Sequence, residues 1–419
     1  MSLEHTATAR MGASLQREQA ALPERCDIAV VGGGIVGLAS ALTLLDRHRE
    51  LRLVILEKEQ SLATHQTAHN SGVIHSGVYF RPGSQKARLC VEGARLMRVF
   101  CAQHGIRVAQ LGKVIVATEP AKVPCLMTLY EHGIANGARG LELVGPQRLR
   151  EIEPNAAGLL AVYSPQTASV DFSEVALAMA NLLRNRGAVI ATGARLVAIH
   201  GVREGLRLTT LRGDILARIL VNCAGLHADV VARMAGDVPS ARVIPFRSEH
   251  FVLRTRSRDL VKGIIYPAPP FLGVHLTRTV NGEVIAGRNA VPAFAREGYR
   301  FSTIRPGDLA AMLGYRGFWM MGAHNRPSGR TVVWRTLSRG AFVQTLRRLV
   351  PEIRAVDVVR AGSGVQPQVV APDGTLLDEF HIMESPRAVH VLNAHSPAAT
   401  ASLALGQRIA GLVFPRLSQ

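Results

Sequence analysis

The sequence lacks the features of a disulfide-bonded, secreted or membrane-spanning protein. Its five cysteines, Cys26, Cys90, Cys101, Cys125 and Cys223, form no C-x-x-C pair and no regular spacing. This scatter argues for a reducing cytoplasm and against a disulfide framework or a zinc site. No apolar run reaches the ~18 residues of a membrane span, and residues 1–26 lack the apolar stretch of a secretory signal. We expect those residues to form a flexible extension.

Acidic and aromatic residues are scarce. The chain has 31 Asp and Glu against 49 Lys and Arg, a formal net charge of +18, and only 5% aromatic residues. The basic residues form no dense run and no aromatic-interleaved patch, so nucleic acid is not an expected partner. A small anionic substrate, an anionic membrane surface or a high-GC arginine bias fits this charge better. At 419 residues and 47% apolar content, the chain is long enough for two packed domains.

A glycine-rich motif follows the first strand-like segment. Residues 28–31 are apolar, and they lead into Gly32, Gly34 and Gly37 with Ile35 and Val36 between them, the pattern G-x-G-x-x-G. An apolar helical stretch at 38–45 and a second strand at 53–56 follow. The first glycine permits a tight turn, the second lets backbone N–H groups approach a pyrophosphate, and the third allows close packing of helix on strand. The segment predicts a dinucleotide-binding βαβ unit.

An acidic residue ends the second strand of this unit. Glu57 lies twenty residues beyond Gly37 and precedes Lys58. Its carboxylate is expected to accept hydrogen bonds from ribose hydroxyls, while the helix N-terminus faces the phosphates with its partial positive charge. A lone glycine motif would fit an ordinary turn. The complete unit favours binding of an adenine dinucleotide, with Lys58 beside it.

The loop at 64–79 is polar and rich in histidine. It contains His65, Asn70, Ser71, Gly72 and His75. Its position after the nucleotide-binding unit suggests a loop passing under the cofactor, although any single histidine could be structural. Its spacing does not demand a metal ion, so no metal site is predicted.

Several segments together resemble one family of flavoproteins. They are the unit at 27–57, HQTAHNSGVIH at 65–75, PFR at 245–247, FLGVHLTR at 271–278, APDG at 371–374 and NAHSPAAT at 393–400. The chain is similar over most of residues 27–411 to the FAD-dependent L-2-hydroxyglutarate dehydrogenases and oxidases, which are D-amino-acid-oxidase-like flavoproteins. The resemblance implies a flavoenzyme with FAD as the cofactor, and the scattered cysteines favour the cytoplasm as its location.

The resemblance also implies an α/β fold with two interleaved domains. The expected FAD-binding Rossmann-like domain comprises residues 27–85, 150–240 and 355–419, and the substrate domain, a mostly antiparallel sheet, comprises 86–149 and 241–354. Strands are expected at 113–117, 219–225, 242–244, 250–253, 263–266, 273–276, 283–286 and 365–370, and helices at 86–104, 124–136, 175–186, 309–321 and 335–349. Further expected FAD contacts are Ala224, Gly225, Ser396, Ala398, Ala399 and Thr400.

The implied reaction is oxidation of a secondary alcohol next to a carboxylate, with hydride passing to flavin N5. A neutral histidine is the natural acceptor of the hydroxyl proton. We expect His275 to be this base and His75 to contact the flavin, although each could be structural.

Cationic and polar side chains are needed to hold a dicarboxylate. Arg247 and Arg278 lie in family motifs, and Tyr266 could add a hydrogen bond. One departure stands out, because Gln366 occupies a place where the family carries arginine. Arg288, where the family usually has proline, could supply the missing charge. Otherwise the substrate is a different small hydroxy or amino acid.

The sequence leaves the electron acceptor open between oxygen and a membrane quinone. The net charge of +18 would favour contact with anionic lipid at the inner face of the cytoplasmic membrane. A further alternative is a flavin-binding protein whose active site has decayed.

Overall fold

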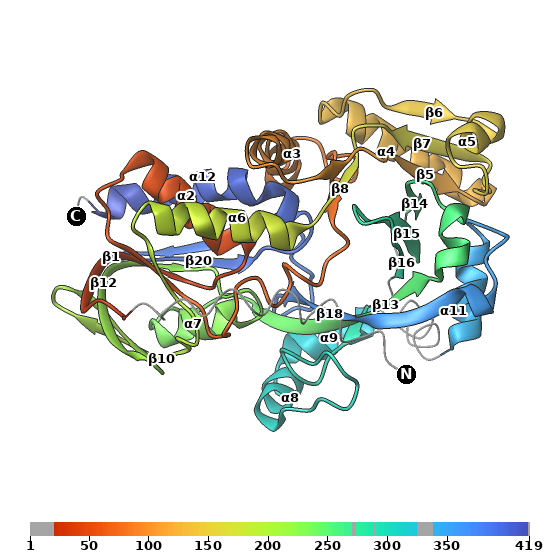
Figure 1. The fold of residues 1–419 in the computed structure, drawn as a ribbon. Coiled ribbons are helices and arrows are strands. Elements are labelled where there is room, and N and C mark those ends of the chain that lie inside the picture. Colours follow the sequence, from red (N-terminus) through yellow and green to blue (C-terminus); the bar gives the residue numbers. More distant parts are fainter. Residues whose placement is uncertain (1–20, 270–273, 288–289, 325–337, 418–419) are drawn as a thin grey trace.

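The computed structural model describes residues 21–269, 274–287, 290–324 and 338–417. Two large sheets lie at opposite ends of the molecule, and chain segments cross between them several times (Figure 1). This confirms the expected α/β class.

The first sheet is built around β1 (Arg25–Val31). β1 pairs in parallel with β2 (Leu53–Leu56) and β12 (Gly213–Asn222), and both faces of these apolar strands are covered. The sheet also contains β9 (Val189–Ala191), β10 (Leu196–Val202), β11 (Gly205–Thr210), β19 (His381–Ser385) and β20 (Ala388–Asn393). Four helices pack together on one side of it: α2 (Ile35–Arg47), α3 (Gln85–Gln103), α6 (Phe172–Asn185) and α12 (Ala398–Leu417) (Figure 1).

The second sheet is mostly antiparallel. Its longest strands, β13 (Arg242–Leu253) and β18 (Val358–Val370), pair along their whole length. The other strands are β5 (Lys113–Ala117), β6 (Glu142–Val144), β7 (Leu160–Ser164), β14 (Ile264–Pro267), β15 (His275–Arg278), β16 (Val284–Gly287) and β17 (Ala290–Pro292). The helices near it are α4 (Val123–Ala135), α5 (Pro146–Ile152), α8 (Pro306–Leu313), α9 (Arg316–His324) and α11 (Arg339–Arg347).

The two faces of this second sheet bury different clusters. Val114 and Leu276 pack with Phe342 of α11 on one face. Ile115 and Tyr266 pack on the other face with Leu126 of α4 and with Val73, Val78 and other residues of the polar loop. This second face therefore looks toward the loop that the sequence places under the cofactor.

Short elements join the two large sheets. A small sheet of β3 (Val73–Ile74), β8 (Ala168–Val170) and β4 (Val108–Ala109) lies between them. The 3₁₀ helices are η1 (Pro120–Lys122), η2 (Gly225–His227), η3 (Thr255–Leu260) and η4 (Ala355–Asp357), and α7 (Ala228–Met234) follows η2 directly.

Most expected elements are confirmed, but several boundaries are wrong. β1 starts at Arg25, inside the expected extension. The expected helix at 309–321 is two helices, because α8 ends at Leu313 with Gly314 as its C-cap and α9 begins at Arg316. The expected strands at 242–244 and 250–253 are one strand. β7 and β18 fall within ranges expected for the FAD domain, yet both join the second sheet. Strand pairing is decided by partners distant in the chain, which composition does not reveal.

Within the described part of the chain, none of the helices combines the length and the hydropathy that a membrane crossing needs.

Candidate active site

A cavity of about 460 Å³ lies where the two sheets approach each other. Its lining comes from many parts of the chain, among them the turn between β1 and α2, the segment after β2, the polar loop, the segment after β12, the segment between β20 and α12, and the strands β13 and β18. The cavity therefore touches both the predicted nucleotide unit and the predicted substrate side.

The glycine turn has no room for a side chain at its first and third motif glycines, Gly32 and Gly37. Gly32 has φ +111°, and a Cβ there would lie 2.4 Å from the carbonyl oxygen of Cys223. A Cβ on Gly37 would lie 2.1 Å from the carbonyl oxygen of Gly32. The N-cap of α2 is Gly34, which offers no side-chain cap, and the first helical turn carries no acidic residue. This end of α2 lines the cavity and favours an anion.

Glu57, which directly follows β2, holds the glycine turn in place through hydrogen bonds. Its carboxylate accepts hydrogen bonds from the backbone N–H groups of Gly33 at 2.7 Å and Glu59 at 2.9 Å, and the residue is 8% exposed. Glu57 and Lys58 both line the cavity. Ile35 N–H donates to the Thr67 hydroxyl at 3.1 Å, which ties the start of α2 to the polar loop. Ile35 and Val36, which the sequence predicts as cofactor contacts, also line the cavity.

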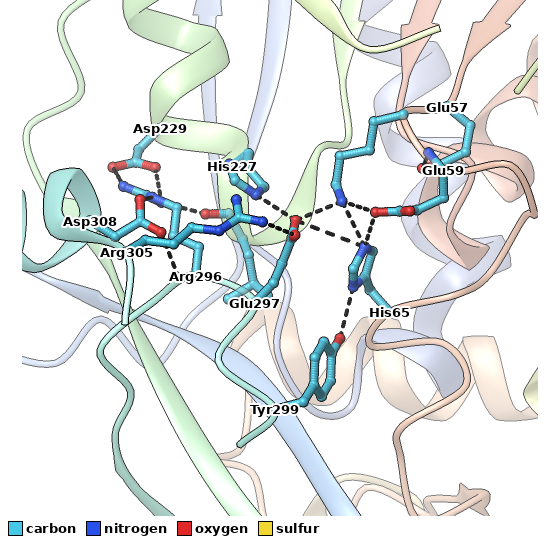
Figure 2. Close-up of polar contacts among 12 residues, drawn as sticks. Glu57, Glu59, His65, His227, Asp229, Arg296, Glu297, Tyr299, Arg305 and Asp308 are labelled. Atoms are coloured by element: carbon cyan, nitrogen blue, oxygen red, sulfur yellow. Dashed lines mark hydrogen bonds and ion pairs between the residues drawn. The ribbon is translucent and has the colours of Figure 1, made fainter. Parts of the chain in front are cut away.

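A charged cluster that the sequence did not predict closes one side of the cavity (Figure 2). The Lys58 ammonium pairs with Glu59 and with Glu297 (2.6 Å), and it lies 2.7 Å from Nε2 of His65. Glu297 also pairs with His227 at 2.9 Å. Hydrogen bonds from His227 and then from Lys58 hold the pKa of Glu297 far below its usual range.

The same cluster has the ligand types of a cation site. Potential ligand atoms of Glu59, His65 and Glu297 lie within 4.8 Å of one another. The Lys58 ammonium already supplies a positive charge to both carboxylates. The Arg305 guanidinium pairs with Glu297 as well, so each of these carboxylates already has a cationic partner.

Glu297 and Tyr299 belong to a segment fastened by a buried ion pair (Figure 2). Arg296 contacts Asp229 of α7 through two bonds of 2.7 and 3.0 Å, and its backbone N–H donates to Asp308 at 2.9 Å. Tyr299 then reaches Nδ1 of His65 at 2.8 Å. The signal that could have identified this segment is weak, because nothing near 293–308 matches a binding motif.

The polar loop is shaped by its own side chains. Asn70 Oδ1 accepts from Gly72 N–H at 2.7 Å, and Gly72 has φ +68° with Val170 O 2.7 Å from where a Cβ would be. His65, Asn70, Ser71 and His75 line the cavity. Gly72 supports the loop from outside that lining.

The segment before α12 closes the loop from the other side. Thr400 Oγ1 accepts from His75 N–H and donates to Val73 O, both at 3.1 Å, and Ser396 Oγ lies 3.4 Å from Nε2 of His75. The remaining predicted contacts, Ala224, Gly225, Ala398 and Ala399, line the cavity with Ser396 and Thr400. The structure therefore brings both distant segments to the predicted nucleotide unit.

The predicted catalytic and substrate residues divide into two groups. His75 and Gln366 line the cavity, together with Ser248 and Gly364. His275 and Tyr266 lie outside its described lining, and their rings contact each other at 4.2 Å between centroids on the sheet face that looks toward the loop.

The predicted arginine clamps are engaged elsewhere. Arg247 Nη2 pairs with Glu249, and its Nε donates to Tyr299 O at 3.0 Å. Arg278 donates to the carbonyl oxygens of Val261 and Arg258, each at 3.0 Å. Neither arginine lines the cavity, so their contacts give no support to a role as substrate clamps. Arg288 and residues 271–273 lie outside the described residues.

Comparison with known proteins finds close relatives over nearly the whole chain. It is 40% identical to the mitochondrial L-2-hydroxyglutarate dehydrogenase of Homo sapiens over 411 residues, 93% of this chain and 89% of that one. It is 38% identical to the L-2-hydroxyglutarate dehydrogenase of Escherichia coli K12, covering 92% and 93% of the two chains. It is 40% identical to the enzyme of the same name from Indibacter alkaliphilus, covering 90% of this chain and 96% of that one.

Solved structures share the fold at lower identity. The L-α-glycerophosphate oxidase of Mycoplasma pneumoniae, solved with FAD bound, has a TM-score of 0.77 at 19% identity, covering 94% of this chain and 95% of that one. The glycine oxidase of Geobacillus kaustophilus has a TM-score of 0.72 at 19% identity, with the same coverage. These neighbours support the expected pairing of a Rossmann-like FAD domain with a substrate domain.

The cavity fits the cofactor of these proteins. Its glycine turn leaves backbone groups open to a pyrophosphate, and the carboxylate of Glu57 lies at the end of β2, where a ribose is held in such folds. The family of FAD dependent oxidoreductases (DAO) matches residues 27–412. From its fold, its dinucleotide cradle and this match, the chain belongs to the DAO family of FAD-dependent oxidoreductases.

Proposed function

We propose that the protein oxidises a small L-2-hydroxy acid, L-2-hydroxyglutarate, to the corresponding 2-oxo acid. The identity of 38–40% to enzymes of that name, over at least 90% of this chain, carries the proposal. When bound, FAD accepts the hydride that leaves the substrate's α-carbon.

His75 is the better candidate for the group that accepts the hydroxyl proton. It lines the cavity beside Ser396, whereas His275 packs on Tyr266 outside the described lining. Thr400 fixes the backbone of His75 through a 3.1 Å hydrogen bond, which supports a defined ring position. This reverses the preference for His275 drawn from sequence.

Gln366 supports a second candidate substrate. It lines the cavity, and a neutral amide there cannot form the charge-assisted pair that an arginine gives a carboxylate. A different hydroxy or amino acid is therefore the alternative. If Arg288 supplies the missing charge, Arg288→Ala raises the KM for 2-hydroxyglutarate. An unchanged KM removes that role.

The test is anaerobic mixing of the purified flavoprotein with L-2-hydroxyglutarate while the visible flavin absorbance is followed. Bleaching supports the reaction and the substrate together. A flavin that dithionite reduces and this acid does not would contradict the proposed substrate, and a panel of hydroxy and amino acids would then separate a changed specificity from a decayed site.

We further propose that the acceptor is oxygen or a membrane quinone, the quinone reached through peripheral contact with anionic lipid. The support is the net charge of +18. Sedimentation with anionic liposomes at low salt tests the contact, and a protein that stays in the supernatant contradicts it. Oxygen consumption during turnover separates the two acceptors.

A further inference from the structure

Lys113 is a fully buried lysine on an interior strand of the second sheet. It is the first residue of β5, 1% exposed, and its neighbours in the sheet are Ser164 and Ile264. Side chains alternate along a strand, so Lys113 lies on the same face as Ile115, which packs in an apolar cluster. Such a position normally carries an apolar side chain.

Two aromatic rings cover the Lys113 ammonium. Nζ lies 4.3 Å from the ring centroid of Tyr79 and 5.3 Å from that of Tyr266. Within the described residues, Nζ has no hydrogen-bond acceptor in reach and no ion-pair partner is recorded for it. Cation–π contacts replace only part of the hydration that a buried ammonium loses. A lysine whose ammonium loses its hydration without a hydrogen-bond acceptor is unusual in a protein interior and needs an explanation.

Lys113 is linked through neighbouring side chains to both predicted histidines, His275 and His75. On one side, Tyr266 contacts the His275 ring at 4.2 Å. On the other side, the Cys90 thiol donates a hydrogen bond to the carbonyl oxygen of His75 at 3.8 Å. A negative charge on this sulfur would raise the pKa of Lys113. Ser164, opposite Lys113 in the sheet, bonds through its hydroxyl to Ser76 at 2.8 Å. Lys113 and its two tyrosines lie outside the described cavity lining, but these contacts link the lysine to His75, which lines it.

The other cations of this region are already balanced. Arg247 and Arg360 both pair with Glu249, and Arg278 is held by backbone carbonyl oxygens. Gln366, which lines the cavity, carries no charge. Of these cations, Lys113 is the one without a recorded carboxylate or carbonyl partner among the described residues.

We propose that Lys113 recognises the carboxylate at the far end of a dicarboxylate substrate, with Tyr79 and Tyr266 as the walls of this subsite. The inference rests on the proposed function. Because the two rings cover the ammonium, entry of the carboxylate requires a tyrosine side chain to rotate. The charge-assisted hydrogen bond then formed is stronger than the aromatic contact given up.

The test compares Lys113→Met with wild type in the flavin-containing protein. Methionine keeps the length and removes the charge, and Lys262→Met, at an exposed position, is the matched control. Anaerobic flavin bleaching gives the Kd of L-2-hydroxyglutarate and of L-2-hydroxypentanoate, which ends in a methyl group. We expect Lys113→Met to raise the Kd of the dicarboxylate by about tenfold to a hundredfold. The Kd of the monocarboxylate should stay unchanged, and the thermal unfolding temperature should not fall.

The pH dependence gives an independent readout. Burial lowers the pKa of Lys113 to about 7. The titratable groups that face it are Tyr79, Tyr266 and Cys90, and burial raises the pKa of both Tyr79 and Cys90. Above about pH 7 the uncharged form of the lysine predominates, so binding of the carboxylate must take up a proton. The Kd of the dicarboxylate should therefore rise with pH in wild type and not in Lys113→Met.

Three results would overturn the inference. One is an unchanged Kd for both acids in Lys113→Met, and another is an equal loss for both acids together with a lower unfolding temperature, which would indicate a structural role. In either case the proposed function stands, because wild type still bleaches with the dicarboxylate. If wild type itself fails to bleach, the proposed function and this inference fall together.

Discussion

The dinucleotide cradle and the substrate side of this protein satisfy their polar groups in different ways. In the cradle, Glu57 is bonded to two backbone N–H groups, and Lys58 is paired with two carboxylates. On the substrate side, Lys113 is buried against aromatic rings, and the cavity is lined by the neutral Gln366. The polar groups of the dinucleotide-binding region are satisfied without a substrate, whereas the Lys113 ammonium has no hydrogen-bond acceptor among the described residues. We therefore expect specificity to depend on the second region and cofactor binding on the first.

Replacing Gly37 should give the largest effect. A Cβ there would lie 2.1 Å from the carbonyl oxygen of Gly32, so Gly37→Ala should cost about 3 kcal/mol or more in stability and abolish flavin binding. Gly411→Ala is the control, because a Cβ at Gly411 in α12 would meet nothing within 4 Å. That change should stabilise the helix by about 0.5–1 kcal/mol. Flavin content and thermal unfolding measure both, and a Gly37→Ala protein that keeps its flavin would contradict the packing argument.

Replacing His75 should separate chemistry from cofactor binding. Loss of a general base lowers turnover by about 10²–10⁴-fold, and His75→Asn should do so while the protein keeps its flavin. His275→Asn should give a smaller loss, because that ring lies outside the described cavity lining. The rate of anaerobic flavin reduction measures both variants. The reverse order of effects would restore His275 as the base.

Acid should weaken the cradle through Glu297. Its pKa is lowered first by the hydrogen bond from His227 and then by Lys58. A lowered folded-state pKa gives stability that is present above the unfolded pKa of ~4.3 and is lost as pH falls below it. Glu297→Gln should therefore show a shallower fall of the unfolding temperature between about pH 5 and 3. Glu283→Gln, whose side chain is 51% exposed, should follow wild type, and parallel curves for all three proteins would contradict this role.

The smallest effect is expected at Arg278. Its bonds to two backbone carbonyl oxygens predict that Arg278→Met costs about 1 kcal/mol of stability and leaves the Kd of the substrate unchanged. Chemical denaturation and flavin bleaching test the two statements. A raised Kd without lost stability would return Arg278 to the substrate site, where its sequence motif had suggested it.

The difference between the dinucleotide-binding region and the substrate side also explains which residues the sequence could predict and which it could not. The dinucleotide-binding unit depends on spacing along one continuous segment, so Gly32, Gly34 and Glu57 could be predicted directly from it. The contacts expected at Ser396, Ala398, Ala399 and Thr400 follow from the family resemblance. Glu297 and Tyr299 were missed, because they reach His65 only through a fold that fastens Arg296 to Asp229.

On the substrate side, Arg278 and His275 belong to the same sequence motif, but they do not lie on the same face of their strand. Alternate residues of a strand point to opposite faces, and Arg278 lies three residues beyond His275, on the face away from Tyr266. Lys113 was read as the start of a strand. Its burial against Tyr79 and Tyr266 depends on the pairing of β5 with β14, which the sequence does not specify.

The most direct test of this account joins flavin reduction to product formation. Purified flavoprotein is mixed anaerobically with L-2-hydroxyglutarate, the loss of flavin absorbance is recorded, and the 2-oxo acid is quantified. The account predicts rapid bleaching with one 2-oxoglutarate formed for each flavin reduced. A flavin that stays oxidised with this acid, yet is reduced by dithionite, would contradict the proposed reaction.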